Sequence, residues 1–127
     1  SHREVGNFIR HEAQDAAKRM FMTKDRPTGI FVANDHMAFG VMDILRSDIG
    51  LKIPQDVSVI GFDDVSLASY NAYDLTTIKQ PIDQMVDSTV NILLDQINHP
   101  EGKCNKIIKI DPYLVIRSST SKVKETK

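Results

Sequence analysis

The 127-residue chain is long enough for one domain with its own hydrophobic core but too short for two domains of ordinary size. Hydrophobic residues make up 41% and charged residues 26%, which is typical of globular proteins, and no apolar run has the length of a membrane span. The net charge of −1 offers no basic field for nucleic-acid phosphates, and the single cysteine excludes an internal disulfide bond. We therefore expect any DNA contact to come from residues outside this chain.

The first predicted elements are an amphipathic helix and a short buried strand. Apolar residues recur at helical spacing over His11–Met22 and predict a helix that Pro27 prevents from continuing. The run Gly29–Ala33 is continuously apolar and too short for a helix, which predicts a strand covered on both faces. Asn34 or Asp35 can then cap the next helix by accepting bonds from its first N–H groups.

The next helix is predicted to end near Asp48 and carries two apolar stripes. One stripe suits packing on a sheet. The second, made of Phe39, Met42 and Ile49, lies on a face that a lone surface helix would leave polar, so we expect a further partner to cover it. A second apolar run, Val57–Phe62, follows and completes a β-α-β unit of parallel strands.

The second half of the chain contains one long helix between short β-prone segments. Leu75–Lys79 is the first of these segments, and Ile82–Ile97 has the clearest amphipathic pattern in the chain. Lys106–Ile110 and Tyr113–Arg117 are predicted as two more strands, and a polar tail follows. The predicted order is α-β-α-β-β-α-β-β, an α/β fold with a parallel sheet flanked by helices.

Two polar residues, Asn34 and Asp63, follow the two buried strands of the β-α-β unit. Ligands of open α/β sheets collect at the carboxyl ends of strands, where helix N-termini and loop side chains converge. A carboxylate accepts hydrogen bonds while an amide both donates and accepts, which suits a polyhydroxyl or heterocyclic ligand. The alternative role for both residues is structural, as helix caps or turn residues. Phe8 can likewise stack on a ring or staple the first helix.

Several motifs together resemble regulators of the lactose/galactose-repressor (LacI/GalR) type. They occur in the order and spacing of that family and cover nearly the whole chain. The matching segments are Gly6–Phe8, Thr28–Gly40, Ile53–Asp64, Leu75–Pro81 and Tyr113–Thr120.

The resemblance implies the C-terminal part of a type I periplasmic-binding-protein-like effector domain, incomplete in this chain. It implies that residues 1–79 form the C-terminal lobe and that 80–111 cross over, with a helix belonging to the N-terminal lobe. Residues 112–121 would form the final strand, returning to the C-terminal lobe, and 122–127 a polar tail. With much of the cleft missing, we expect weak or no effector binding by this chain alone.

The resemblance also implies a function without catalysis, cofactor or metal. The regulator would be cytoplasmic and homodimeric, would sense a sugar or purine-like small molecule, and would bind DNA only through a helix-turn-helix outside this chain. The residues expected to contact the effector are Phe8, Asn34, Asp63 and Gln80, and those expected at the dimer interface are Phe39, Met42, Ile49 and Tyr70.

Two other functions are consistent with parts of the sequence. An extracytoplasmic sugar-binding protein of a transporter would share the two-lobed fold. An Mg²⁺-dependent hydrolase could use the adjacent carboxylates of Asp63 and Asp64, although no phosphate-binding loop or nucleophile motif accompanies them.

Overall fold

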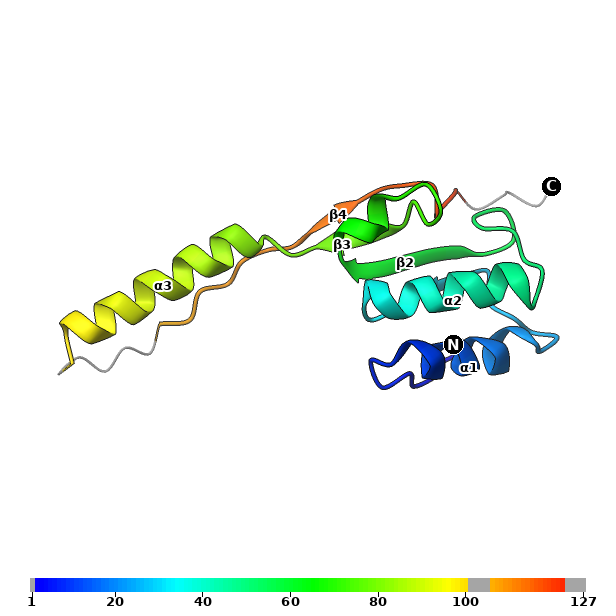
Figure 1. Ribbon diagram of the computed structural model, residues 1–127, viewed down its shortest axis with the longest axis horizontal. Coiled ribbons are helices and arrows are strands. Elements are labelled where there is room, and N and C mark those ends of the chain that lie inside the picture. Colours follow the sequence, from blue (N-terminus) through cyan, green and yellow to red (C-terminus); the bar gives the residue numbers. More distant parts are fainter. Residues whose placement is uncertain (1, 101–105, 123–127) are drawn as a thin grey trace. The chain divides into compact units, whose positions relative to one another are not determined.

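The computed structural model describes residues 2–100 and 106–122 (Figure 1). The predicted helices are confirmed to within about two residues at each end, and the predicted β-α-β unit is present. Its first strand is not covered on both faces as predicted, because Gly29 and Phe31 are exposed. Cys104 and the tail beyond Lys122 lie outside the described residues. The elements are helix α1 (Arg10–Phe21), strand β1 (Gly29–Phe31), helix α2 (Asp35–Ser47), strand β2 (Ser58–Asp63), the 3-10 helix η1 (Ser66–Ser69), strand β3 (Thr76–Lys79), helix α3 (Ile82–Asn98) and strand β4 (Tyr113–Val115).

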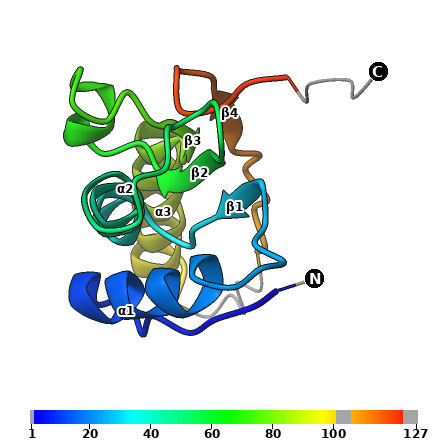
Figure 2. The same ribbon diagram turned by 90° about the vertical axis from the view of Figure 1, so that its right-hand side faces the viewer.

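The four strands form one sheet in the order β1-β2-β3-β4 (Figure 2). Strands β1 and β2 are parallel, as expected when a helix connects neighbouring strands, and β2 and β3 are also parallel. The C-terminal segment also binds the sheet, because Ser119 accepts a backbone bond from Val59 and donates one to Asp74. The sheet therefore joins the middle of the chain to its C-terminal part.

The strand predicted over Lys106–Ile110 is absent. Its isoleucines Ile107 and Ile108 are 87% and 50% exposed, and none of the described strands pairs with this segment. A β-prone sequence forms a stable strand only when a neighbouring strand supplies hydrogen-bond partners. The prediction failed because residue preference alone does not reveal whether that neighbour is available.

The hydrophobic core lies around α2, which is buried on two sides. It packs on β2, and α1 lies next to it and packs against it (Figure 1, Figure 2). Phe39 and Met42, expected at a dimer interface, are fully buried within the chain, and the ring of Tyr73 packs on Phe39 with centroids 4.4 Å apart. The second apolar stripe therefore has its covering partner inside this chain, and these two side chains are not exposed to another molecule.

The chain divides into two compact units. The first contains Ser1–Lys79 and Leu114–Lys127, and the second contains Gln80–Tyr113. Helix α3 of the second unit has no buried residue, and its apolar side chains, from Ile82 to Ile97, are exposed except for the half-buried Ile92. Within residues 2–100 and 106–122, no helix combines the length and apolar composition that a membrane span requires.

Candidate functional site

Asn34 and Asp63 occupy equivalent positions at the carboxyl ends of two neighbouring parallel strands: Asn34 lies three residues beyond β1, and Asp63 is the last residue of β2. In the register of β1 and β2, Phe31 lies opposite Ile60, and the paired residues are 29 positions apart in the chain. Asn34 and Asp63 are separated by the same 29 positions, three residues beyond that pair. The sheet thus brings the two predicted ligand contacts to the same edge, where α/β proteins bind small molecules.

Asn34 is the N-cap of α2. Its side-chain oxygen accepts a hydrogen bond of 2.8 Å from the backbone N–H of Met37, which satisfies one of the unpaired donors of the first helical turn. The structural role considered from the sequence is therefore real. It does not exclude a ligand contact, because the side chain is only half-buried and its amide nitrogen is a donor that the cap does not use.

Asp63 and Asp64 have an unusual backbone conformation for residues with a side chain. Their φ angles are +118° and +57°, in the region that favours glycine. Such conformations cost free energy and persist only where the surrounding structure fixes them. Such conformations cluster at functional sites, which makes this segment a candidate site.

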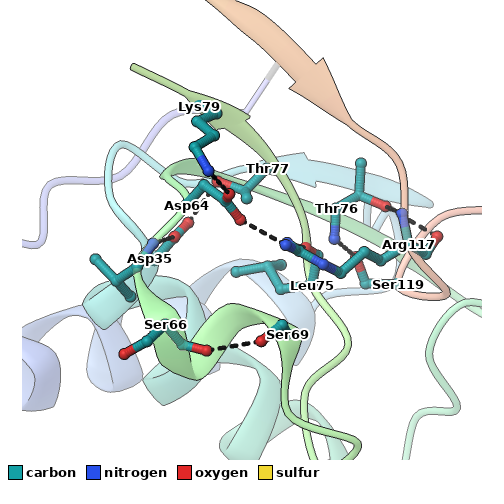
Figure 3. Close-up of polar contacts among 11 residues, drawn as sticks. Asp35, Asp64, Ser66, Ser69, Leu75, Thr76, Thr77, Lys79, Arg117 and Ser119 are labelled. Carbon is teal, nitrogen blue, oxygen red and sulfur yellow. Dashed lines mark hydrogen bonds and ion pairs between the residues drawn. The ribbon is translucent and has the colours of Figure 1, made fainter. Parts of the chain in front are cut away.

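Asp64 is held in place by two basic side chains (Figure 3). Its carboxylate oxygens lie 2.6 Å from Nη2 of Arg117 and 3.3 Å from Nζ of Lys79. The Asp64 side chain is only 8% exposed, and Arg117 also donates a 2.7 Å bond to the carbonyl of Leu75. Asp64 therefore has a structural role, unlike the magnesium-binding role considered from the sequence.

Asp35, one residue after the cap, is fully buried. Its Oδ1 accepts a 2.6 Å bond from the hydroxyl of Thr77 on β3, and its Oδ2 accepts a 3.0 Å bond from the backbone N–H of Val65 (Figure 3). Burial raises the pKa of the Asp35 carboxyl group, and these hydrogen bonds oppose that rise. Among the described residues, no basic side chain forms an ion pair with it.

Sequence reasoning placed Asp35 as a possible cap and missed this buried position. One signal was present in Gly61, in the middle of an otherwise bulky strand. A Cβ atom at Gly61 would overlap with Oδ1 of Asp35 and lie 2.9 Å from a methyl group of Leu75. A glycine inside a strand often marks such a close approach.

The structure does not gather all predicted effector contacts in one hollow. Phe8 is 73% exposed, so it does not staple α1, and its φ is +59°. It lines an apolar hollow of about 820 Å³ between the N-terminal segment, α1 and β1, which Asn34 and Asp63 do not line. Gln80 begins the second unit.

Of the predicted dimer contacts, Tyr70 is 59% exposed and Ile49 is partly buried against the core. Within the described part of the chain, no three His, Cys, Asp or Glu side chains gather as a metal site requires.

Residues 2–120 match the family described as the periplasmic binding protein-like domain. The chain belongs to this family. As a periplasmic binding protein-like domain, it has the fold that its resemblance to LacI/GalR effector domains implied, and its solved structural neighbours include members of that group.

Three relatives are informative. The chain is 40% identical to the HTH-type transcriptional repressor PurR of Vibrio vulnificus over 118 residues. These aligned residues make up 93% of this chain and 35% of the repressor. It matches a LacI family transcriptional regulator from Enterococcus faecalis V583 with bound ribose at 34% identity and a TM-score of 0.82, over 94% of this chain and 43% of that one. A LacI family regulator from Arthrobacter sp. FB24 in complex with lactose matches at 27% identity and a TM-score of 0.79, over 92% of this chain and 43% of that one.

The chain spans about a third of the length of the PurR repressor that it matches. The similarity to relatives with bound sugars supports a ligand-binding role for the fold, while the individual contacts of Phe8, Asn34, Asp63 and Gln80 remain predictions.

Proposed function

We propose that the chain is the effector-binding and dimerisation part of a LacI/GalR-type transcriptional regulator that senses a small molecule, with a sugar as the first candidate. The observation that carries this proposal is the matched position of Asn34 and Asp63 at the carboxyl ends of two adjacent parallel strands. The regulator is a cytoplasmic homodimer without catalytic activity, and a helix-turn-helix outside this chain binds the DNA. Effector binding changes the relative populations of two lobe arrangements and so the affinity for the operator.

The polar groups at this edge are well suited to a sugar. The Asp63 carboxylate accepts hydrogen bonds from ligand hydroxyl groups, and the Asn34 amide nitrogen donates one, because the cap uses its oxygen. Phe8 supplies an apolar ring face, and Gln80 adds a second amide near the start of the second unit. The relatives with bound ribose and lactose support this class of ligand.

The dimer contacts that we retain are Tyr70 and Ile49. Tyr70 lies just after η1 and is exposed, and Ile49 lies just beyond the end of α2. Phe39 and Met42 are left out because they are buried in the core. The regulator is favoured over a transporter component because the PurR relative is a repressor. It is favoured over a hydrolase because Asp64 already contacts Arg117 and Lys79.

The proposal is tested in the full-length regulator with ribose, lactose and hypoxanthine as probes. Titration calorimetry measures binding, and operator affinity is measured with and without each probe. Asp63→Asn should weaken binding of the responding probe by about tenfold to a hundredfold, as expected for the loss of a charge-assisted hydrogen bond. Operator affinity without the probe should stay unchanged. Asp25→Asn, in an exposed turn, is the matched control. An unchanged response in the Asp63 variant would overturn the assignment.

A further inference from the structure

Asp35 connects three parts of the first unit although it directly follows an ordinary helix cap. It is the first residue of α2, its Oδ1 binds Thr77 on β3, and its Oδ2 binds the backbone of Val65 beyond β2. Asn34, its neighbour, already caps the helix. Capping therefore does not explain why the Asp35 side chain is fully buried.

Burying a carboxyl group is unfavourable unless nearby donors compensate it. Here the compensating donors include the Thr77 hydroxyl at 2.6 Å and the backbone N–H of Val65 at 3.0 Å. Gly61 makes the space, since any side chain there would collide with Oδ1 of Asp35. An apolar residue would fill this space at lower cost, so the carboxyl group is better explained by what it binds.

What Asp35 binds is the backbone next to the strained segment. Asp63 and Asp64 have positive φ angles, and Val65, which donates to Asp35, is the next residue. On its other side the segment is fixed through the Asp64 side chain by Arg117 and Lys79 (Figure 3). Strained residues persist where the surrounding structure fixes their conformation. Here the contacts of Val65 with Asp35 and of Asp64 with Arg117 and Lys79 fix the segment.

We propose that Asp35, held by Thr77, is a positioning residue that fixes the backbone of residues 63–65 and so sets the direction of the Asp63 side chain. This inference rests on the proposed effector role of Asp63. Asp35 itself does not touch the ligand. It acts through the Val65 N–H and links the cap residue Asn34 to the strand-end segment that carries the second ligand contact.

The first test measures the backbone directly, without any ligand. In the 127-residue chain, strong intraresidue HN–Hα NOEs and backbone carbon shifts of Asp63 and Asp64 report positive φ. Asp35→Ala should abolish these signals for at least one of the two residues. Asp35→Asn should keep them, because its side-chain oxygen can accept from Val65 while its NH₂ group donates to the Thr77 hydroxyl. Asp48→Ala, an exposed aspartate at the other end of α2, is the control.

A second pair of variants decides the matter if Asp35→Ala does not fold. Thr77→Val removes the hydroxyl that holds Asp35 at nearly constant volume, whereas Thr77→Ser retains it. We expect weakened positive-φ signals at Asp63 and Asp64 in the valine variant and unchanged signals in the serine variant. A folded Asp35→Ala protein with wild-type signals would overturn the proposal. If Asp35→Ala is unfolded, wild-type signals in Thr77→Val would overturn it.

The ligand consequence is measured with ribose by titration calorimetry in the full-length regulator. Asp35→Ala should weaken ribose binding by about tenfold, equivalent to about 1.4 kcal/mol, while Asp35→Asn should bind nearly as the wild type does. If the wild type binds neither ribose nor lactose, the proposed sugar ligand fails, and the NMR comparison still decides whether Asp35 fixes the segment. If ribose binds equally well to wild type and to a folded Asp35→Ala protein, the positioning role is wrong and the proposed function stands.

Discussion

Helices α2 and α3 have similarly amphipathic sequences but very different surroundings. Nine residues of α2 are buried, whereas α3, which is longer, has none. Helix α2 packs against β2 on one side and α1 on another, within one compact unit. Apart from the half-buried Ile92, the apolar residues of α3 are exposed, from Met85 at 41% to Ile97 at 71%. Apolar periodicity thus shows that a helix needs a covering surface but not whether the same chain supplies it.

The largest expected effect compares the same substitution on the two helices. Leu45 of α2 is fully buried and Leu94 of α3 is 52% exposed. Leu45→Ala should lower the free energy of unfolding by about 2–5 kcal/mol, because it removes buried methyl groups and leaves a cavity. Leu94→Ala should change it by less than about 0.5 kcal/mol. Urea unfolding followed by circular dichroism measures both. Equal decreases in the free energy of unfolding would show that α3 is covered by another surface in solution, which would contradict its exposure in the structure.

The elements that could be predicted from sequence are those whose pattern is local. The helical spacing of residues 11–22 and the proline and cap signals around 27–35 gave α1 and the start of α2 nearly correctly. The two apolar runs gave β1 and β2, and a helix of the right length between them implied parallel pairing. The positions of Asn34 and Asp63 followed from this topology.

What could not be predicted depends on contacts between distant residues. The second apolar stripe of α2 was assigned to a dimer partner because the pattern does not distinguish a neighbouring helix of the same chain from another molecule. Segment 106–110 was assigned as a strand because residue preference does not supply a pairing partner. Asp35 was considered only as a possible helix cap, and its burial was missed because the Thr77 and Val65 donors that allow it are 42 and 30 positions away.

A smaller effect is expected from the ion pairs of the two units. The carboxylate of Asp64 and the guanidinium of Arg117 are 8% and 15% exposed, whereas Lys106 and Asp95 in the second unit are 62% and 44% exposed. Arg117→Gln should cost about 2–3 kcal/mol, because a largely buried carboxylate loses its closer basic partner. Lys106→Gln should cost less than about 1 kcal/mol. Urea titrations of both variants measure the difference, and similar values would mean that burial adds nothing at Asp64.

The smallest expected effect concerns the carboxyl group that begins α2. Burial raises the pKa of Asp35 above its ordinary value of 3.8. Between that value and the raised pKa, the folded protein retains a proton that the unfolded chain has released, so this contribution to stability falls as pH rises. The side chain introduced by Asp35→Asn does not titrate, so the variant does not lose stability in this way as pH rises. Its stability relative to the wild type should therefore increase as pH rises from about 4 to about 7.

Thermal unfolding at a series of pH values measures this trend. Asp83→Asn is the matched control, because Asp83 lies in the first turn of α3 and is exposed. That substitution should change the unfolding free energy by less than about 0.5 kcal/mol. A stability difference between Asp35→Asn and the wild type that is constant or shrinks with rising pH would contradict the raised pKa. Burial would then have no effect on the proton equilibrium of the carboxyl group that begins α2, and this feature would not distinguish α2 from α3.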